Sequence, residues 1–166
     1  MQDGGLVFYI RHASTEKDYA DQVKADVNDG STQRVLSEKG WHEAVHIGTA
    51  FRFYNIPVGK VLTSQYFRAW QTAWLAFGKY KKTDQLNFLP FEEYNVNQTL
   101  KMKNIIEPIL SKKPSVGENT VIVAHDDPFE AATNIYPKPQ GVCYVIKPQG
   151  NGKFSILGKI RPGEWR

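Results

Sequence analysis

The chain has 166 residues, of which 41% are hydrophobic and 13% aromatic, and this suits one compact domain with its own core. The net charge of +4 comes without a basic stripe among aromatic residues, which argues against nucleic-acid binding and is compatible with a small anionic partner. The single cysteine, Cys143, excludes an internal disulfide framework, and no apolar run is long enough to predict a membrane span.

The chain opens on MQDGG and passes straight into an apolar run, so no targeting segment is visible. Both a cytoplasmic protein and an exported one that has lost its leader fit this start. The sequence therefore leaves the compartment open.

The first third of the chain predicts a strand, a long loop and a helix. Residues 6–10 (LVFYI) form an apolar run after two glycines and predict a buried strand. The polar stretch 11–35 predicts a loop. Ser37 is placed to cap a helix that reaches Tyr54, and Pro57 marks its end.

The remainder alternates further strands with helices. Ser64 is placed to cap a helix that ends at Phe77, before Gly78. On this helix Trp70 and Trp74 share one face, which we expect to lie in the core. Predicted strands cover residues 60–63, 86–89, 120–124, 142–147 and 154–160, the last two as a hairpin around PQGNG, and a further helix covers 98–110 with Pro108 near its end.

This alternation predicts a single α/β domain over residues 1–166. The expected architecture is a three-layer αβα sandwich, in which a largely parallel sheet has helices on both faces. In such sheets ligands bind beyond the carboxyl ends of the strands, so the chemistry should be sought there.

Cationic and imidazole side chains follow these strand ends. The first strand ends in Arg11 and His12, Arg68 lies one helical turn beyond the second, and the 120–124 strand ends in His125 and Asp126. Arginine grips phosphoryl oxygens in a two-pronged fork, and imidazole can be the nucleophile that accepts the phosphoryl group. The pattern predicts a phosphate site.

Four motifs in this order resemble those of the histidine phosphatase superfamily, which has the phosphoglycerate mutase-like fold. They are FYIRHAST, LSEKGWHEA, VLTSQYFRAWQTA and VIVAHDD, and they extend over residues 5–133. The resemblance implies that His12 is the nucleophile and that Arg11, Arg68 and His125 bind the phosphoryl oxygens. It also implies that the Thr15 hydroxyl touches phosphate and that no metal or other cofactor takes part.

The proton donor to the leaving group is open between two places. One branch of the superfamily uses an aspartate directly after the second histidine, which is Asp126 here. Another uses a glutamate on a separate segment, for which Glu92 or Glu93 could serve. Asp127, followed by Pro128, is instead expected to cap the next helix.

The segment HEAVH also matches the zinc-protease pattern H-E-x-x-H. His42 and His46 are four residues apart, so they can share a helix face and a metal. A protease site would need a third ligand and would leave the strand-end residues without a role. We therefore expect His42, Glu43 and His46 to lie on a solvated helix face.

The resemblance favours a metal-independent phosphatase acting on a small phosphorylated molecule. Phosphoglycerate mutases of the superfamily carry a W-N pair shortly after the first motif, whereas this chain has Lys17 and Asp18. An aspartate there would repel a second anionic group, which argues against mutase activity. The alternative is a catalytically silent module that binds a phosphorylated ligand or a protein.

Overall fold

A computed structural model describes residues 1–17, 20–22, 24–90 and 93–165. One six-stranded sheet runs through it in the order β3-β2-β4-β1-β5-β6. Parallel pairing joins the first four, and antiparallel pairing joins β5 to β1 and to β6. The strands are β1 (Val7–Arg11), β2 (Val58–Thr63), β3 (Lys81–Lys82), β4 (Asn119–Ala124), β5 (Cys143–Gly150) and β6 (Lys153–Ile160).

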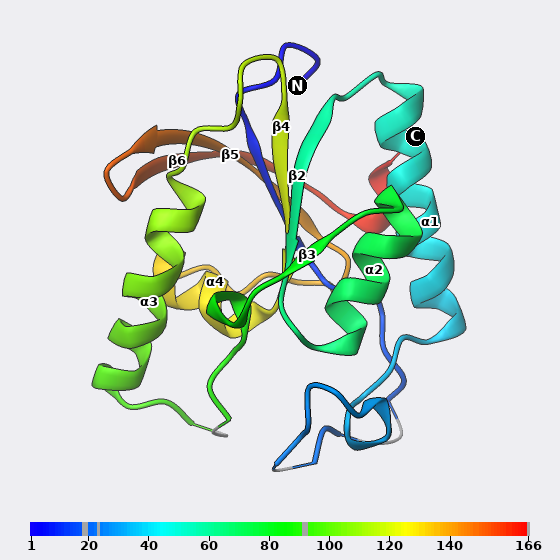
Figure 1. Ribbon diagram of the computed structural model, residues 1–166, viewed down its shortest axis with the longest axis vertical. Helices are drawn as coiled ribbons and strands as arrows, with labels where there is room; N and C mark the ends of the chain where they lie inside the picture. Colours follow the sequence, from blue (N-terminus) through cyan, green and yellow to red (C-terminus); the bar gives the residue numbers. More distant parts are fainter. Residues whose placement is uncertain (18–19, 23, 91–92, 166) are drawn as a thin grey trace.

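Helices cover both faces of this sheet, as Figure 1 shows. On one face lie α1 (Glu38–Phe53) and α2 (Phe67–Phe77), and on the other α3 (Val96–Leu110) and α4 (Asp126–Thr133). Three short 3-10 turns, η1 (Gly30–Thr32), η2 (Asp84–Leu86) and η3 (Pro162–Glu164), lie in the connections. The expected three-layer αβα sandwich is confirmed.

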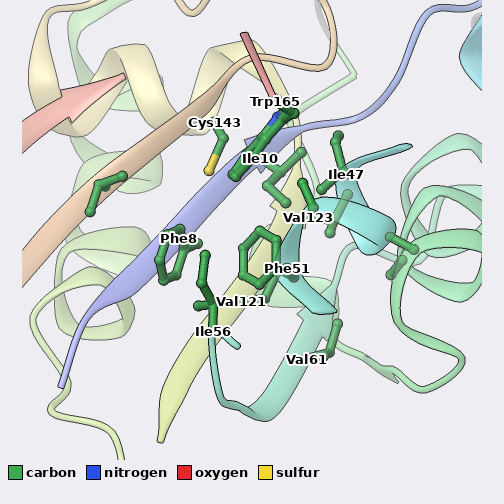
Figure 2. Packing of buried hydrophobic residues seen from close by; sticks show 14 of the residues in the cluster. Phe8, Ile10, Ile47, Phe51, Ile56, Val61, Val121, Val123, Cys143 and Trp165 are labelled. Atoms are coloured by element: carbon green, nitrogen blue, oxygen red, sulfur yellow. The ribbon is translucent and has the colours of Figure 1, made fainter. Parts of the chain in front are cut away.

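The side chains of β1 contribute to two separate cores, one on each face of the sheet, because alternate side chains of a strand point to opposite sides. On the α1–α2 face, Phe51 packs against Phe8 and Trp165, with ring centroids 4.9 and 5.3 Å apart, as Figure 2 shows. On the α3–α4 face, Tyr9 packs against Phe129 at 4.6 Å. Cys143 lies buried in the first of these cores, as expected.

The carboxyl ends of β1, β4 and β2 meet at one edge of the sheet, toward the bottom of Figure 1. The connection from β1 to α1 is drawn in blue near the bottom of the same view, beyond this edge. Its two ends are tied together, since the Ser37 N–H and hydroxyl donate to the Ser14 carbonyl at 3.0 and 3.1 Å. A Cβ on Gly40 would lie 1.9 Å from that same carbonyl oxygen, so only glycine lets α1 approach this closely.

Several helix and strand boundaries differ from the prediction. Residues 86–89 form no strand: Leu86 ends η2 and enters the core, and Phe88 stacks on Tyr66, so burial of these side chains outweighs pairing. The strand next to β2 is instead β3. The helix expected over 98–110 begins two residues earlier, where Asn95 and Gln98 form a capping box.

Two predicted helix caps are also wrong. Ser64 does not cap α2, whose N-cap is Tyr66, because the Ser64 hydroxyl is hydrogen-bonded to His125. Asp127 does not cap α4, which begins at Asp126 directly after His125. The helix therefore starts immediately at the end of β4, with no intervening loop.

Trp70 and Trp74 do not enter the core as expected. Trp74 is 55% exposed, and Trp70 stacks on Tyr80 with centroids 5.6 Å apart. The core beneath α2 is instead lined by its small residues Ala69, Ala73 and Ala76. Among the described residues, no helix has the length and apolar character needed to cross a bilayer.

Candidate active site

His12 lies at the centre of the strand-end cluster and is 1% exposed. Its backbone N–H donates to the Ala124 carbonyl at 2.9 Å, which extends the β1–β4 pairing by one residue. Its ring nitrogen Nδ1 lies 2.9 Å from the Ala13 carbonyl oxygen, and Nε2 lies 3.2 Å from Nε of Arg68. A carbonyl can only accept and a guanidinium can only donate, so this geometry holds the proton on Nδ1 and a lone pair on Nε2.

The surroundings keep this imidazole neutral. Burial lowers the pKa of His12 well below its usual value, and the nearby positive charge of Arg68 lowers it further. Arg11 and Arg34 act in the same direction, while the hydrogen bond to Ala13 opposes them. At neutral pH Nε2 is therefore unprotonated, and its lone pair accepts the Arg68 Nε–H, which an incoming electrophile would have to displace.

His125 lies opposite, with its ring centroid 5.5 Å from that of His12. Its Nε2 is 2.7 Å from the Ser64 hydroxyl, which itself accepts the Tyr66 N–H at 3.3 Å. The hydroxyl keeps one proton and one further lone pair, so it can donate to Nε2 or accept from it, and the contact fits either tautomer of the ring. Within the described part of the chain Nδ1 has no hydrogen-bond partner. Burial, followed by Arg68, lowers the pKa of His125 well below its usual value.

Arg68 is 3% exposed and lies beside the packed rings of Tyr66 and Phe88. Its guanidinium carbon lies 5.0 Å from the Tyr66 ring centroid and 5.5 Å from that of Phe88. Its Nη1 and Nη2 donate to the two carboxylate oxygens of Asp21 at 2.8 and 2.9 Å. Burial lowers the pKa of Arg68, and Asp21 counteracts that shift.

Arg11 is paired with Asp126 in a similar way. Its Nη2 lies 2.7 Å from Oδ2 of Asp126, and its Nη1 donates to the Pro137 carbonyl at 2.9 Å. The Tyr136 hydroxyl donates to the same Oδ2 at 2.7 Å. Oδ2 is thus engaged by two donors.

The other predicted residues differ in how they are placed. Thr15 is buried, but its hydroxyl accepts a hydrogen bond from Nε2 of Gln140 at 3.1 Å. Glu93 is exposed. Glu92 lies outside the described residues, as does Asp18, on which the argument against mutase activity rested. The structure thus brings Arg11, His12, Arg68, His125 and Asp126 together at one edge, with Thr15 adjoining.

Three residues around this cluster were missed from the sequence. Asp21 and Arg34 lie in the long loop, and the positive charge of Arg34 lowers the pKa of both His12 and His125. No motif or periodicity marked them in that stretch. Ser64 was noticed only as a helix cap, although its place directly after a strand end was a usable signal.

The HEAVH segment lies on α1 and its side chains have separate partners. Glu43 accepts the Ser14 N–H at 2.9 Å and lies 3.6 Å from Lys39. His46 contacts the Trp165 carbonyl through Nε2, and the His42 side chain is 82% exposed. Across the described ranges, no three His, Cys, Asp or Glu side chains are grouped so that they could hold a metal ion.

Comparison with known proteins gives likenesses at the level of structure alone. No family model and no curated protein matches the sequence. The protein histidine phosphatase SixA, solved with tungstate, superposes with a TM-score of 0.69 at 13% identity, over 97% of this chain and 99% of that one.

The protein has the histidine phosphatase fold. A putative alpha-ribazole-5'-P phosphatase from Escherichia coli gives a TM-score of 0.68 at 13% identity, over 96% of this chain and 98% of that one. A phosphoserine phosphatase from Entamoeba histolytica, in complex with phosphoserine, gives 0.65 at 14% identity, with coverage of 96% and 98%. The resemblance inferred from the four motifs is thereby confirmed as a resemblance of fold, and activity must be argued from the site.

Proposed function

We propose that the protein is a metal-independent phosphatase that hydrolyses a phosphomonoester through a phosphohistidine on Nε2 of His12. The observation that carries this proposal is the state of His12. Its Nδ1 is held by the Ala13 carbonyl, and its Nε2 lone pair faces the Arg68 guanidinium in a buried, cationic site.

In the first step Nε2 of His12 attacks phosphorus in line with the leaving oxygen, and the P–O bond to the alcohol breaks. Arg11, Arg68 and His125 would hold the non-bridging oxygens and offset their negative charge. The fixed donors need little rearrangement as that charge is redistributed.

The departing alkoxide needs a proton, for which we favour Asp126. It lies at the start of α4, directly after His125 and paired with Arg11. In the second step water attacks the phosphohistidine, the same carboxylate takes up its proton, and His12 and inorganic phosphate are released.

The proton donor is identified by assaying three variants on phosphate esters of good and poor leaving groups. They are Asp126→Asn, Glu92→Gln and Glu93→Gln. If Asp126 is the donor, its amide variant should lose most activity on esters of alkyl alcohols and least on esters of acidic phenols. A loss of that kind confined to a glutamate variant would assign the role to that glutamate.

The substrate class is a small phosphorylated molecule. Solved structures of the same fold include phosphatases named for phosphohistidine, phosphoserine and alpha-ribazole phosphate. The cluster binds the phosphoryl group, which these substrates share. A panel of phosphate esters, with phosphohistidine included as a phosphoramidate, run with wild type and His12→Ala, gives the preferred leaving group.

The intermediate provides the direct test. Radiolabelled substrate mixed with enzyme and quenched in alkali, where phosphohistidine survives, should leave label on the wild type and none on His12→Ala. Turnover by His12→Ala at the wild-type rate would overturn the proposal.

One observation favours a second candidate, a silent module that binds a phosphorylated ligand. Both arginines of the cluster already have carboxylate partners, and Oδ2 of Asp126 already accepts two hydrogen bonds. Intact binding of inorganic phosphate, with no turnover of p-nitrophenyl phosphate from acid to neutral pH, would favour this candidate.

A further inference from the structure

Asp21 is an acidic residue of the long loop that touches the cluster directly. Its Oδ1 accepts Nη1 of Arg68 at 2.8 Å and the Arg34 N–H at 2.7 Å, and its Oδ2 accepts Nη2 of Arg68 at 2.9 Å. The side chain is 20% exposed, against 3% for that of Arg68. The carboxylate therefore closes the cluster from the solvent side.

The guanidinium of Arg68 is divided between two partners. Its terminal edge, Nη1 and Nη2, is taken by Asp21, and its Nε donates to Nε2 of His12. Nη2 has a second hydrogen on the same side as Nε, because the group is planar. The edge formed by Nε and Nη2 therefore faces His12 as a two-pronged donor.

We propose that Asp21 is a positioning residue, which holds the Nε edge of Arg68 toward His12 and limits how tightly the site retains inorganic phosphate. This inference rests on the proposed function. Asp21 keeps the guanidinium from turning its terminal edge to the anion, and its negative charge balances one of the cations that the phosphate meets.

The effect of Asp21 on phosphate affinity is electrostatic, and its effect on the orientation of Arg68 is geometric. A buried guanidinium without a carboxylate would attract the phosphate dianion more strongly, since a nearby negative charge opposes binding even when partly screened by solvent. Product that is bound more tightly leaves more slowly. A bidentate partner also fixes the plane of the guanidinium, which a single hydrogen bond to His12 does not.

The test is Asp21→Asn, with inorganic phosphate titrated into the full-length protein in a calorimeter and steady-state kinetics measured beside it. We expect the Kd for phosphate to fall about tenfold, by the charge argument above, while kcat falls severalfold. Asp21→Glu, which keeps the charge, should stay near the wild-type phosphate affinity.

Asp29→Asn is the matched control. It removes the same charge from the same loop, where Asp29 accepts the Ser31 N–H and hydroxyl at 2.9 and 2.7 Å and is exposed. This variant should bind phosphate as the wild type does. If Asp21→Asn fails to fold, Asp21→Ser takes its place.

Damage to the fold would weaken phosphate binding or leave it unchanged, so tighter binding with slower turnover is a signature of the proposed role. Unchanged or weaker phosphate binding in Asp21→Asn would overturn it, as would equal tightening in Asp29→Asn. The calorimetric result is independent of turnover. If the wild type proves inactive, the proposed function fails while the charge-balancing role of Asp21 is still tested.

Discussion

The two pairs of histidines in this protein occupy opposite environments. His12 and His125 follow two neighbouring strands and are each 1% exposed, and burial, followed by the charge of Arg68, lowers the pKa of both. His42 and His46 are four residues apart on α1, where one ring is in solvent and the other contacts a backbone carbonyl. The pair that matches the H-E-x-x-H pattern has separate partners, while the rings of the pair separated by more than a hundred residues lie 5.5 Å apart in one cluster.

The difference teaches that burial and neighbouring charge, rather than spacing in the sequence, prepare an imidazole for chemistry. Each strand-end ring has one nitrogen fixed by an oxygen and the other turned to the cluster. Neither nitrogen of the exposed His42 is fixed by a buried partner. Variants of both pairs and of Ser64 sharpen this contrast.

The largest effect is expected for His12→Asn. Removal of the nucleophile should lower kcat/KM by on the order of a thousandfold or more, while the fold persists. Initial rates with p-nitrophenyl phosphate measure it, and circular dichroism checks the fold. A loss below about tenfold would mean that another group performs the attack.

The next effect is expected for His125→Gln, about a hundredfold in kcat/KM, because one donor to the phosphoryl oxygens is lost.

Ser64→Ala should lower kcat/KM less, about tenfold, since it removes the hydrogen bond to Nε2 of His125 and leaves the ring in place. Ser64→Thr retains the hydroxyl and should recover part of that loss. If Ser64→Ala matched wild type, the hydrogen bond to Nε2 would have no part in turnover.

A smaller effect concerns stability against acid. The pKa values of His12 and His125 are lowered in the folded protein, so below about pH 6.5 only the unfolded chain takes up these protons. Stability is therefore lost as pH falls from about 6.5 toward 5, by up to about 1.4 kcal/mol per pH unit for each histidine.

Urea unfolding at several pH values measures this slope. The double variant His12→Asn/His125→Gln should flatten it, and His42→Gln should leave it unchanged. An equal slope in wild type and double variant would mean that these imidazoles do titrate in the folded state.

The smallest effects are expected on α1. His42→Gln should change the free energy of unfolding by less than about 0.5 kcal/mol, as for other exposed positions. His46→Gln removes the contact with the Trp165 carbonyl and should cost about 1 kcal/mol. Both variants should keep wild-type turnover with and without a chelator. Activity lost with either histidine and restored by zinc would break the contrast.

The strand ends could be predicted because local patterns determine them. An apolar run such as residues 6–10 or 120–124 becomes a central strand, so whatever follows it is delivered to the sheet edge. Arg11, His12, His125 and Asp126 were found for that reason. Their catalytic roles stay predictions until the variants are measured.

The long loop could not be predicted, because its conformation depends on contacts across the fold. Asp21 is 47 positions from Arg68 in the sequence, and Gln140 is 125 positions from Thr15, yet each pair is hydrogen-bonded. The exposed position of Trp74 was missed for a related reason. Helix periodicity gives the faces of α2, but the closeness of its neighbours decides which face is buried.

The junction between Ser14, Ser37 and Gly40 has a consequence for how relatives of this protein could diverge. Because Ser37 is hydrogen-bonded to Ser14, residues 15–36 belong to a loop whose two ends are in contact. Lengthening such a loop costs little conformational entropy, and β1 and His12 need not shift when the length of the loop changes. Insertions and deletions in this segment could therefore alter which alcohol is admitted while the phosphoryl chemistry is inherited unchanged.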